Sequence, residues 1–291
     1  MNEIRQRILE GERALYDSHE LHVTDTVFRN GESPLKESSD LILDNCNFEW
    51  KYPLWYCRNV VANDCTWLDM ARAGVWYTDN ITVNRALIEA PKNFRRCRGL
   101  VLNEVTLPNA AETLWNCADV TADHLTAKGD YFAMNCENIT LDHFVLDGNY
   151  SFDGCRNVTI RNAKLLSKDA FWNCENVLVE DSYICGEYTA WNSKNVIFRN
   201  CVLESLQGLC YVEGLTLENC KLINTTLSFE YSKDISADVT TKIDSVFNPS
   251  SGRIAAPAIG ELILEKELVD ETKTAIDCGD IERKSDRPEW R

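Results

Sequence analysis

The sequence predicts an all-β protein, a single-stranded, right-handed parallel β-helix. Three observations carry this prediction: a repeat of about twenty residues, an alternation of apolar and polar positions within each repeat, and a restricted choice of residue at one turn. The chain has 291 residues, of which 44% are hydrophobic and 26% are charged. This is enough apolar material for a sizeable core.

Each repeat has an apolar anchor residue, and successive anchors are 19 to 21 residues apart. A second apolar position follows two residues after the anchor, and a third lies six residues before it. Each repeat therefore holds three short strand-like runs separated by polar turns, which is typical of a β-helix coil. About 11–12 such coils, mostly of 19–20 residues, are predicted from the anchors Leu21, Leu41, Val60, Ile81, Leu100, Val120, Ile139, Val158, Val177, Val196, Leu215 and Ile235.

The residue directly before the anchor is Asn, Asp or Gly in every repeat from Asn59 to Asp234. These three types tolerate a left-handed backbone conformation, so they indicate that the same corner recurs in each coil. Parallel crossovers are right-handed in the great majority of sheets, which gives the predicted hand. A leucine-rich-repeat-like solenoid is the alternative, because Val177, Val179 and Ile184 follow that spacing; the short period and the β-like remainder of each repeat favour the β-helix.

The ends of such a coil stack need covering, because they expose core and unpaired backbone. We expect an N-terminal cap at residues 1–20, the β-helix at 21–245 and a C-terminal cap or tail at 246–291, within one structural domain. The repeat pattern fails after about residue 245.

The thirteen cysteines and the absence of an apolar segment behind a basic start indicate no signal peptide and reduced thiols, hence a cytoplasmic protein. Six cysteines, from Cys57 to Cys174, lie three residues before an anchor, and we expect an inward ladder of space-filling side chains. The net charge of −16 argues against a nucleic-acid partner, and no stretch is apolar enough for a membrane partner.

The position five residues before the anchor predicts a stripe that faces outward, because it mixes Trp with Arg, Lys and Asp. Aromatic rings beside amides and charges suit a carbohydrate, and the basic early repeats suit an anionic sugar or another acidic small molecule. The predicted ligand-binding residues are Lys36, Glu37, Tyr52, Trp55, Tyr56, Arg72, Trp76, Tyr77, Arg95, Arg96, Trp115, Tyr131, Trp172 and Trp191.

The sequence leaves catalysis open. Glycoside hydrolase-like or polysaccharide lyase chemistry needs paired carboxyl groups or a base, for which the candidates are Glu112, Asp130, Asp153 and Lys92. The alternative is a non-catalytic scaffold or oligomerisation module, for example a homodimer that buries the stripe. A C-terminal tail lying over the stripe is a third arrangement.

The sequence predicts no cofactor. The one pair of candidate metal ligands is His124 and His143, which occupy equivalent positions in adjacent repeats, each behind an aspartate.

Several long segments of the early repeats resemble an uncharacterised bacterial family, domain of unknown function 3737. The resemblance implies a pectin-lyase-like right-handed β-helix, and it implies no activity for particular residues. The segments are GERALY, GESPLKES, KYPLWY, MARAGVWYT and APKNFRR.

Overall fold

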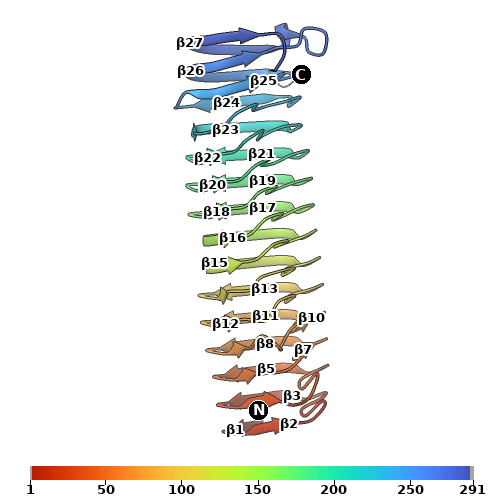
Figure 1. The fold of residues 1–291 in the computed structure, drawn as a ribbon. Coiled ribbons are helices and arrows are strands. Elements are labelled where there is room, and N and C mark those ends of the chain that lie inside the picture. The colour runs from red at the N-terminus through yellow and green to blue at the C-terminus, as the bar shows by residue number, and fades with distance from the viewer. Residues whose placement is uncertain (1, 289–291) are drawn as a thin grey trace. The chain divides into compact units, whose positions relative to one another are not determined.

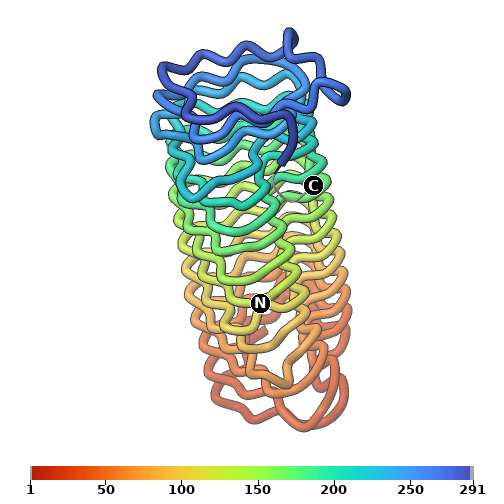
Figure 2. The backbone as a smooth tube through the Cα atoms, turned by 45° about the horizontal axis from the view of Figure 1, so that its top comes forward, coloured from red at the N-terminus to blue at the C-terminus, as the bar shows by residue number. Residues whose placement is uncertain are grey.

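The computed structural model describes residues 2–288 and comprises two compact units, Met1–Gly148 and Asn149–Arg291. Each unit is a stack of parallel strands connected by short turns (Figure 1). Within each unit, successive turns of the backbone follow nearly the same outline (Figure 2). The predicted all-β parallel β-solenoid is therefore confirmed.

The strands of the first unit are mostly two to six residues long. They are β1 (Asn2–Arg5), β2 (Ile8–Glu10), β3 (His19–Thr24), β4 (Val27–Arg29), β5 (Ser39–Asp44), β6 (Asn47–Phe48), β7 (Leu54–Trp55), β8 (Arg58–Asn63), β9 (Thr66–Trp67), β10 (Val75–Trp76), β11 (Asp79–Asn84), β12 (Leu87–Ile88), β13 (Arg98–Asn103), β14 (Thr106–Leu107), β15 (Ala118–Lys128) and β16 (Glu137–Asp147).

The second unit continues in the same style and ends in two long strands. Its elements are β17 (Arg156–Arg161), β18 (Lys164–Leu166), β19 (Glu175–Glu180), β20 (Tyr183–Cys185), β21 (Lys194–Arg199), β22 (Val202–Glu204), β23 (Glu213–Leu222), β24 (Ile235–Val239), β25 (Ile243–Phe247), β26 (Gly252–Ile263), the 3₁₀ turn η1 (Glu271–Lys273) and β27 (Thr274–Ser285).

The predicted anchors pair with one another in parallel. Leu41 pairs with Leu21 on one side and Val60 on the other, and Val177 pairs with Val158 and Val196 in the second unit. The leucine-rich-repeat alternative is wrong, because η1 is the only helical element in the described part of the chain.

Coil-type pairing also extends into the segments expected to be caps. Strand β1 pairs in parallel with β3, and β2 with β4, so the N-terminal segment has the pairing of a coil. Beyond residue 245, β26 pairs with β24 and then with β27. The partners of Gly252 there are Ile235 and Thr274, at spacings of 17 and 22 residues. These spacings explain why the period of 19–20 residues is lost from the sequence after residue 245.

The interior of each unit is filled by apolar columns whose members stack from coil to coil. Phe28, Phe48 and Trp67 stack at centroid distances of 5.0 Å in the first unit, and Phe152 stacks on Phe171 at 5.1 Å in the second. All five side chains are buried. Each such side chain contributes roughly 1.5–3 kcal/mol on removal from water.

The cysteine column does more than fill space. The Cys136 thiol donates a hydrogen bond to the Leu114 carbonyl at 2.9 Å, and its sulfur accepts one from the Cys117 backbone N–H at 3.3 Å. Ser193 makes the same two contacts in its coil, to Phe171 O and from Cys174 N. The position therefore requires a small side chain with a hydrogen-bonding γ atom, a requirement that the sequence prediction missed.

Burial raises the pKa of Cys57 and of Cys174 to about 12, which keeps these thiols protonated and able to donate. All thirteen cysteines are free thiols in the described residues. Among residues 2–288 there is also no apolar helix with the length to cross a lipid bilayer.

Candidate functional site

The predicted stripe runs along β7, β10 and the equivalent positions of the next coils in the first unit. Trp76 pairs in parallel with Trp55 and with Arg95, and Trp115 pairs with Arg95 and with Met134. The adjacent positions, Leu54, Val75, Phe94 and Leu114, are fully buried. By strand alternation the stripe side chains lie on the outer surface, where each is half-buried.

These outer side chains are stacked on one another. The rings of Trp55 and Trp76 are 5.1 Å apart and inclined by 6°. The Arg95 guanidinium then lies between two indoles, 5.1 Å from the Trp76 centroid and 4.3 Å from that of Trp115. Both faces of Trp76 are therefore occupied, and the expected packing of a sugar ring on this indole face has no room.

Each indole also holds the next coil in place. The Nε1–H of Trp76 donates to Lys92 O at 2.8 Å, and that of Trp115 donates to Tyr131 O at 2.8 Å. Both acceptors belong to corner residues with positive φ, 61° and 60°. The indoles thus stabilise strained corners one coil further on, a structural role for which the sequence holds no separate signal.

A second ladder lies one position along and is more exposed. Tyr56 and Tyr77 stack at 4.7 Å with 2° between their planes. The Lys36 ammonium lies 5.6 Å from the Tyr56 centroid, and the Arg96 guanidinium lies 5.7 Å from that of Tyr77. Two tyrosines are therefore capped by a cation at each end.

We call the surface formed by these two ladders and their neighbours the basic–aromatic face. Arg72 and Arg96 are exposed on it, and neither forms an ion pair with any described residue. The face comprises Lys36, Tyr52, Trp55, Tyr56, Arg72, Trp76, Tyr77, Lys92, Arg95 and Arg96.

Two further predicted residues, Glu37 and Tyr131, border this face, and Tyr52 lies within it. Glu37 accepts a hydrogen bond from the Tyr16 hydroxyl at 2.7 Å, which lowers the pKa of Glu37, and it lies 3.5 Å from the Lys36 ammonium. Tyr52 packs on Trp55 with a centroid distance of 4.5 Å. Tyr131 is exposed, and its carbonyl receives the Trp115 N–H.

The predicted catalytic carboxylate Glu112 is neutralised by two cations. Its oxygens lie 2.5 Å from Arg95 Nη2 and 3.2 Å from Lys92 Nζ. Partial burial raises the pKa of Glu112, but the hydrogen bonds from Arg95 and Lys92 outweigh this effect and hold it below its usual range. Such a carboxyl group is a poor proton donor, and Lys92 is engaged as its counter-ion.

The remaining catalytic candidates, Asp130 and Asp153, lie in different units of the chain. The Glu112 N–H donates to the Asp130 backbone carbonyl at 3.0 Å, which places Asp130 on the neighbouring coil, and its side chain is exposed. Asp153 belongs to the second unit, where it accepts a hydrogen bond from Asn173 Nδ2 at 2.9 Å.

The stripe of the second unit has a different composition. The rings of Trp172 and Trp191 are 6.2 Å apart and tilted by 33°, and Trp172 Nε1 donates to Tyr188 O at 2.9 Å. Nearby, Asp169 is only 3% exposed, and its Oδ1 has no hydrogen-bond partner among the described residues. Burial raises the pKa of Asp169, which makes it a better proton donor than Glu112, although it was not among the predicted catalytic residues.

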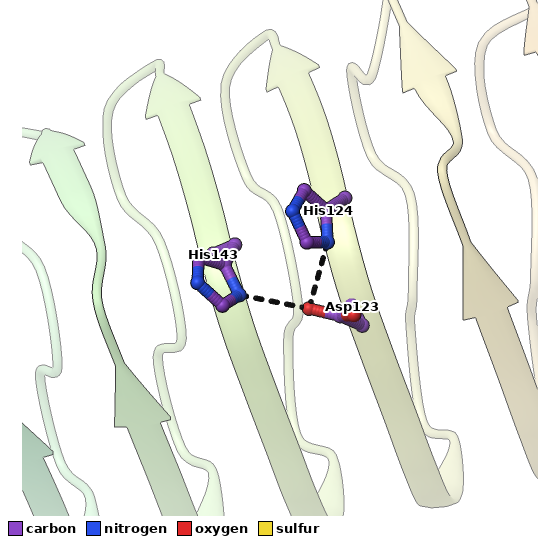
Figure 3. A group of neighbouring side chains, drawn as sticks. All are labelled: Asp123, His124 and His143. Atoms are coloured by element: carbon purple, nitrogen blue, oxygen red, sulfur yellow. Dashed lines mark hydrogen bonds and ion pairs between the residues drawn. The ribbon is translucent and has the colours of Figure 1, made fainter.

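His124 and His143 lie side by side at another position of the repeat, next to Asp123 (Figure 3). Their ring centroids are 4.4 Å apart. The predicted pairing of these histidines on adjacent coils is therefore present in the structure.

The structure has surface concavities near residues 262–287, over Asn157–Ile197 and over Asn59–Thr121, the last on the sheet formed by the anchor strands. None of these concavities is lined by a residue of the basic–aromatic face. This arrangement suits an extended or macromolecular ligand better than a small molecule, which normally occupies a concave site.

Parallel coils with side-chain ladders inside and outside define a parallel β-solenoid protein. The chain belongs to the family described as "Protein of unknown function (DUF3737)", whose model matches residues 2–277, and the resemblance seen in the sequence is confirmed. No curated protein matches the sequence.

Three solved structures that are similar to this chain have low sequence identity to it. A tailspike protein mutant of E. coli bacteriophage HK620, in complex with a pentasaccharide, is 7% identical, with a TM-score of 0.42 over 91% of this chain and 68% of the tailspike chain. The pentapeptide repeat protein HetL from Nostoc is 12% identical, with a TM-score of 0.28 over 78% and 90%. The A-module of a mannuronan C-5 epimerase from Azotobacter vinelandii is 9% identical, with a TM-score of 0.27 over 99% and 89%.

Proposed function

We propose that this protein binds an extended anionic carbohydrate along its basic–aromatic face and does not cleave it. The observation that carries the proposal is the outer ladder Lys36–Tyr56–Tyr77–Arg96, in which cations cap a pair of stacked tyrosines and Tyr56 and Arg96 are exposed.

The charge of this face supports an anionic ligand. The chain as a whole has a net charge of −16, yet the face and its two bordering carboxylates, Glu37 and Glu112, combine five cationic side chains with two acidic ones. Glu112 is shared by Lys92 and Arg95, which leaves Arg72 and Arg96 without an acidic partner among the described residues. A local positive surface on an acidic protein attracts anions and keeps neutral or cationic ligands at a disadvantage.

The shape of the face supports an extended ligand. Equivalent groups recur once per coil, and neighbouring strands of a sheet are separated by roughly 4.8 Å. Successive carboxylates and hydroxyls of a polymer would therefore meet cations and tyrosine hydroxyls at regular intervals. Arginine gives planar, two-point hydrogen bonding to carboxylates, which favours uronic-acid sugars.

The electrostatics of Glu112, the predicted catalytic carboxylate that borders the face, favour binding without cleavage. A glycosidase needs one carboxyl group with a raised pKa as acid and a second carboxylate at a defined separation. Glu112 has a lowered pKa, and its two cationic neighbours hold it ionised.

The test is a titration of the full chain with a uronic-acid oligosaccharide, monitored by tryptophan fluorescence and by calorimetry. A neutral glucan oligosaccharide of equal length is titrated in parallel as the control ligand. We expect binding of the uronic-acid probe only, weakened at least about ten-fold in the double variant Arg72→Gln/Arg96→Gln, because each lost charged hydrogen bond costs about 1.5–3 kcal/mol. The control is Arg85→Gln, an exposed arginine of the same unit that is paired with Asp64. Equal binding of both oligosaccharides, or an unaffected double variant, would refute the proposal.

A second candidate function is a protein-interaction surface. Tyr, Trp and Arg dominate the basic–aromatic face, and these are the residue types enriched at the centres of protein interfaces. Light scattering separates the two functions: a self-association surface predicts a dimer mass that falls in the Arg72→Gln/Arg96→Gln variant, with no response to either oligosaccharide.

A further inference from the structure

We infer that Asp123, His124 and His143 form a binding site for a divalent transition-metal ion of the zinc type. The site is separate from the basic–aromatic face, and its existence does not depend on the proposed carbohydrate ligand.

The three residues are held by two of the best-paired strands of the first unit. Strands β15 and β16 pair in parallel along most of their length, with Asp123 opposite Asp142 and Leu125 opposite Phe144. Leu125 and Phe144 are fully buried directly after the two histidines, so the backbone beneath the cluster is anchored in the core. A site on paired strands is more precisely positioned than one on a loop.

The corner conformation brings the two imidazoles together. His124 and His143 both have positive φ, 54° and 48°. Their rings are 4.4 Å apart and inclined by 15°, and both point toward the Asp123 carboxylate (Figure 3). All three side chains are exposed, so an ion from solvent can reach them.

The donor atoms already lie near the separations that a metal ion requires. The Nδ1 atoms of His124 and His143 are each 3.0 Å from the same Oδ1 of Asp123, and the ligand atoms of the three residues lie within 4.8 Å of one another. With bonds of about 2.0–2.1 Å, a tetrahedral ion separates its ligand atoms by roughly 3.3 Å. With small side-chain movements, an ion can take the place of these two hydrogen bonds, each neutral imidazole binding it through Nδ1 and carrying its proton on Nε2.

The donor set selects the class of metal. Two imidazole nitrogens and one carboxylate oxygen suit Zn²⁺, Ni²⁺ or Cu²⁺, whereas Ca²⁺ and Mg²⁺ prefer oxygen ligands alone. Three protein ligands leave at least one position for water, which indicates an exchangeable site rather than a closed structural one. Asp142 Oδ1 lies 3.4 Å from His143 Nδ1 and adds a second negative charge beside the cluster.

The repeat itself shows that the fold does not require these residues. At the position of Asp123, the preceding coils carry Asn63, Asn84 and Asn103, which form an amide ladder with hydrogen bonds of 2.8 Å. Neutral amides therefore satisfy this corner. The change to aspartate followed by histidine occurs in two adjacent coils, where it creates a compact set of metal donors.

The test uses the full chain with reduced thiols, titrated with Zn²⁺ in competition with a chromogenic chelator. We expect one equivalent of Zn²⁺ per chain from this site. His124→Gln and His143→Gln should each weaken that binding at least about ten-fold, since even loss of an outer-shell partner costs 10–100-fold. His22→Gln is the matched control, because His22 also contacts an aspartate, Asp44 at 2.6 Å, but has no second imidazole beside it.

Cobalt separates this site from the thiols. Co²⁺ bound by imidazole and carboxylate lacks the intense sulfur-to-metal charge-transfer absorption of a thiolate site. We expect that absorption to be absent in the wild-type complex and the weak d–d bands to disappear in His143→Gln. Failure to bind either ion, equal binding by wild type and both histidine variants, or dependence of the bound equivalent on the partly exposed Cys185 or Cys278 would overturn the inference. Circular dichroism of each variant checks that the strands are retained.

Discussion

The same repeat position is used differently in the two units. Four residues before the anchor, the first unit carries Tyr56, Tyr77 and Arg96, which stack face to face and leave hydroxyl and guanidinium edges in solvent. In the second unit, Asn192 donates to Asn173 at 2.8 Å, and Asn173 donates to Asp153 at 2.9 Å. The Asn192–Asn173–Asp153 ladder uses its polar groups on itself, whereas the Tyr56–Tyr77–Arg96 ladder leaves them exposed. Later coils of the second unit carry Tyr211 and Tyr231 at this position, with ring centroids 5.5 Å apart and planes inclined by 49°.

Charged columns show the same contrast. Arg161, Glu180 and Arg199 of the second unit are linked by hydrogen-bonded ion pairs of 2.8 and 2.5 Å, and Arg199 is bonded in turn to Glu218. In the first unit, Arg96 has an aromatic neighbour but no acidic one. The paired charges of the second unit stabilise neighbouring coils, whereas Arg96 has no acidic partner among the described residues and is the cation that the proposed function assigns to an anionic ligand.

The largest expected effect on stability comes from removing a tryptophan side chain, and it should differ between the stripes of the two units. Trp76→Ala removes stacking on Trp55, the contact with Arg95 and the hydrogen bond to Lys92 O, and we expect a loss of about 3 kcal/mol in unfolding free energy. Trp172→Ala should cost about 1 kcal/mol less, because its one ring partner is tilted and more distant. Urea unfolding followed by circular dichroism measures both, and equal losses would contradict the contrast between the stripes.

The interior should not show this contrast, because both units use the same small-residue column. Ser193→Ala leaves the Cys174 N–H and the Phe171 carbonyl without their partner, and we expect a loss of about 2 kcal/mol. Ser193→Cys should recover most of it, since cysteine fills this role in six other coils. If serine and cysteine differ as much as serine and alanine, the column is selected for volume and not for hydrogen bonding.

A smaller effect comes from the compensated charges. Hydrogen bonds from Arg199 and then Arg161 hold the pKa of Glu180 below its usual range. The resulting stabilisation is present above the unfolded pKa of about 4.3 and is lost as the pH falls through the lower, folded value. Arg199→Met should therefore destabilise by about 1 kcal/mol or less at pH 7, and its stability should fall less steeply than that of wild type on acidification, as thermal unfolding from pH 7 to pH 3 would show.

The smallest effect on stability should occur where the charge is uncompensated. Arg96→Gln removes no ion pair, so we expect its unfolding free energy to stay within about 0.5 kcal/mol of wild type. The same substitution should weaken binding of a uronic-acid oligosaccharide measurably. A large loss of stability would show that Arg96 belongs to the stack, as Arg199 does.

The repeat predicted most of the fold because backbone pairing follows spacing alone. Once the anchors are aligned, the inward and outward positions follow from strand alternation, and the pairing of Leu41 with Leu21 and Val60 confirms the register. The terminal coils could not be recognised from the repeat pattern, for a physical reason. Asn2 is exposed although it pairs with Leu21, and the spacings around Gly252 change to 17 and 22 residues, so neither place shows the apolar period.

The site was less predictable because the contacts of long side chains depend on their rotamers, which residue spacing does not determine. Spacing placed Trp76, Arg95 and Trp115 in one column, but it did not indicate that the guanidinium lies between the two indoles. The ion pairs of Glu112 with both Arg95 and Lys92, which lower its pKa, likewise depend on rotamers.

The most direct test of the difference between the units is oxidative footprinting of tyrosines with and without a uronic-acid oligosaccharide. Tyr56 and Tyr211 occupy the same repeat position and are 47% and 40% exposed, so their labelling without ligand should be similar. We predict that the ligand protects Tyr56 and Tyr77 and leaves Tyr211 unchanged. Protection of Tyr211, or undiminished labelling of Tyr56 and Tyr77 at saturating ligand, would contradict the assignment of the binding surface to the first unit.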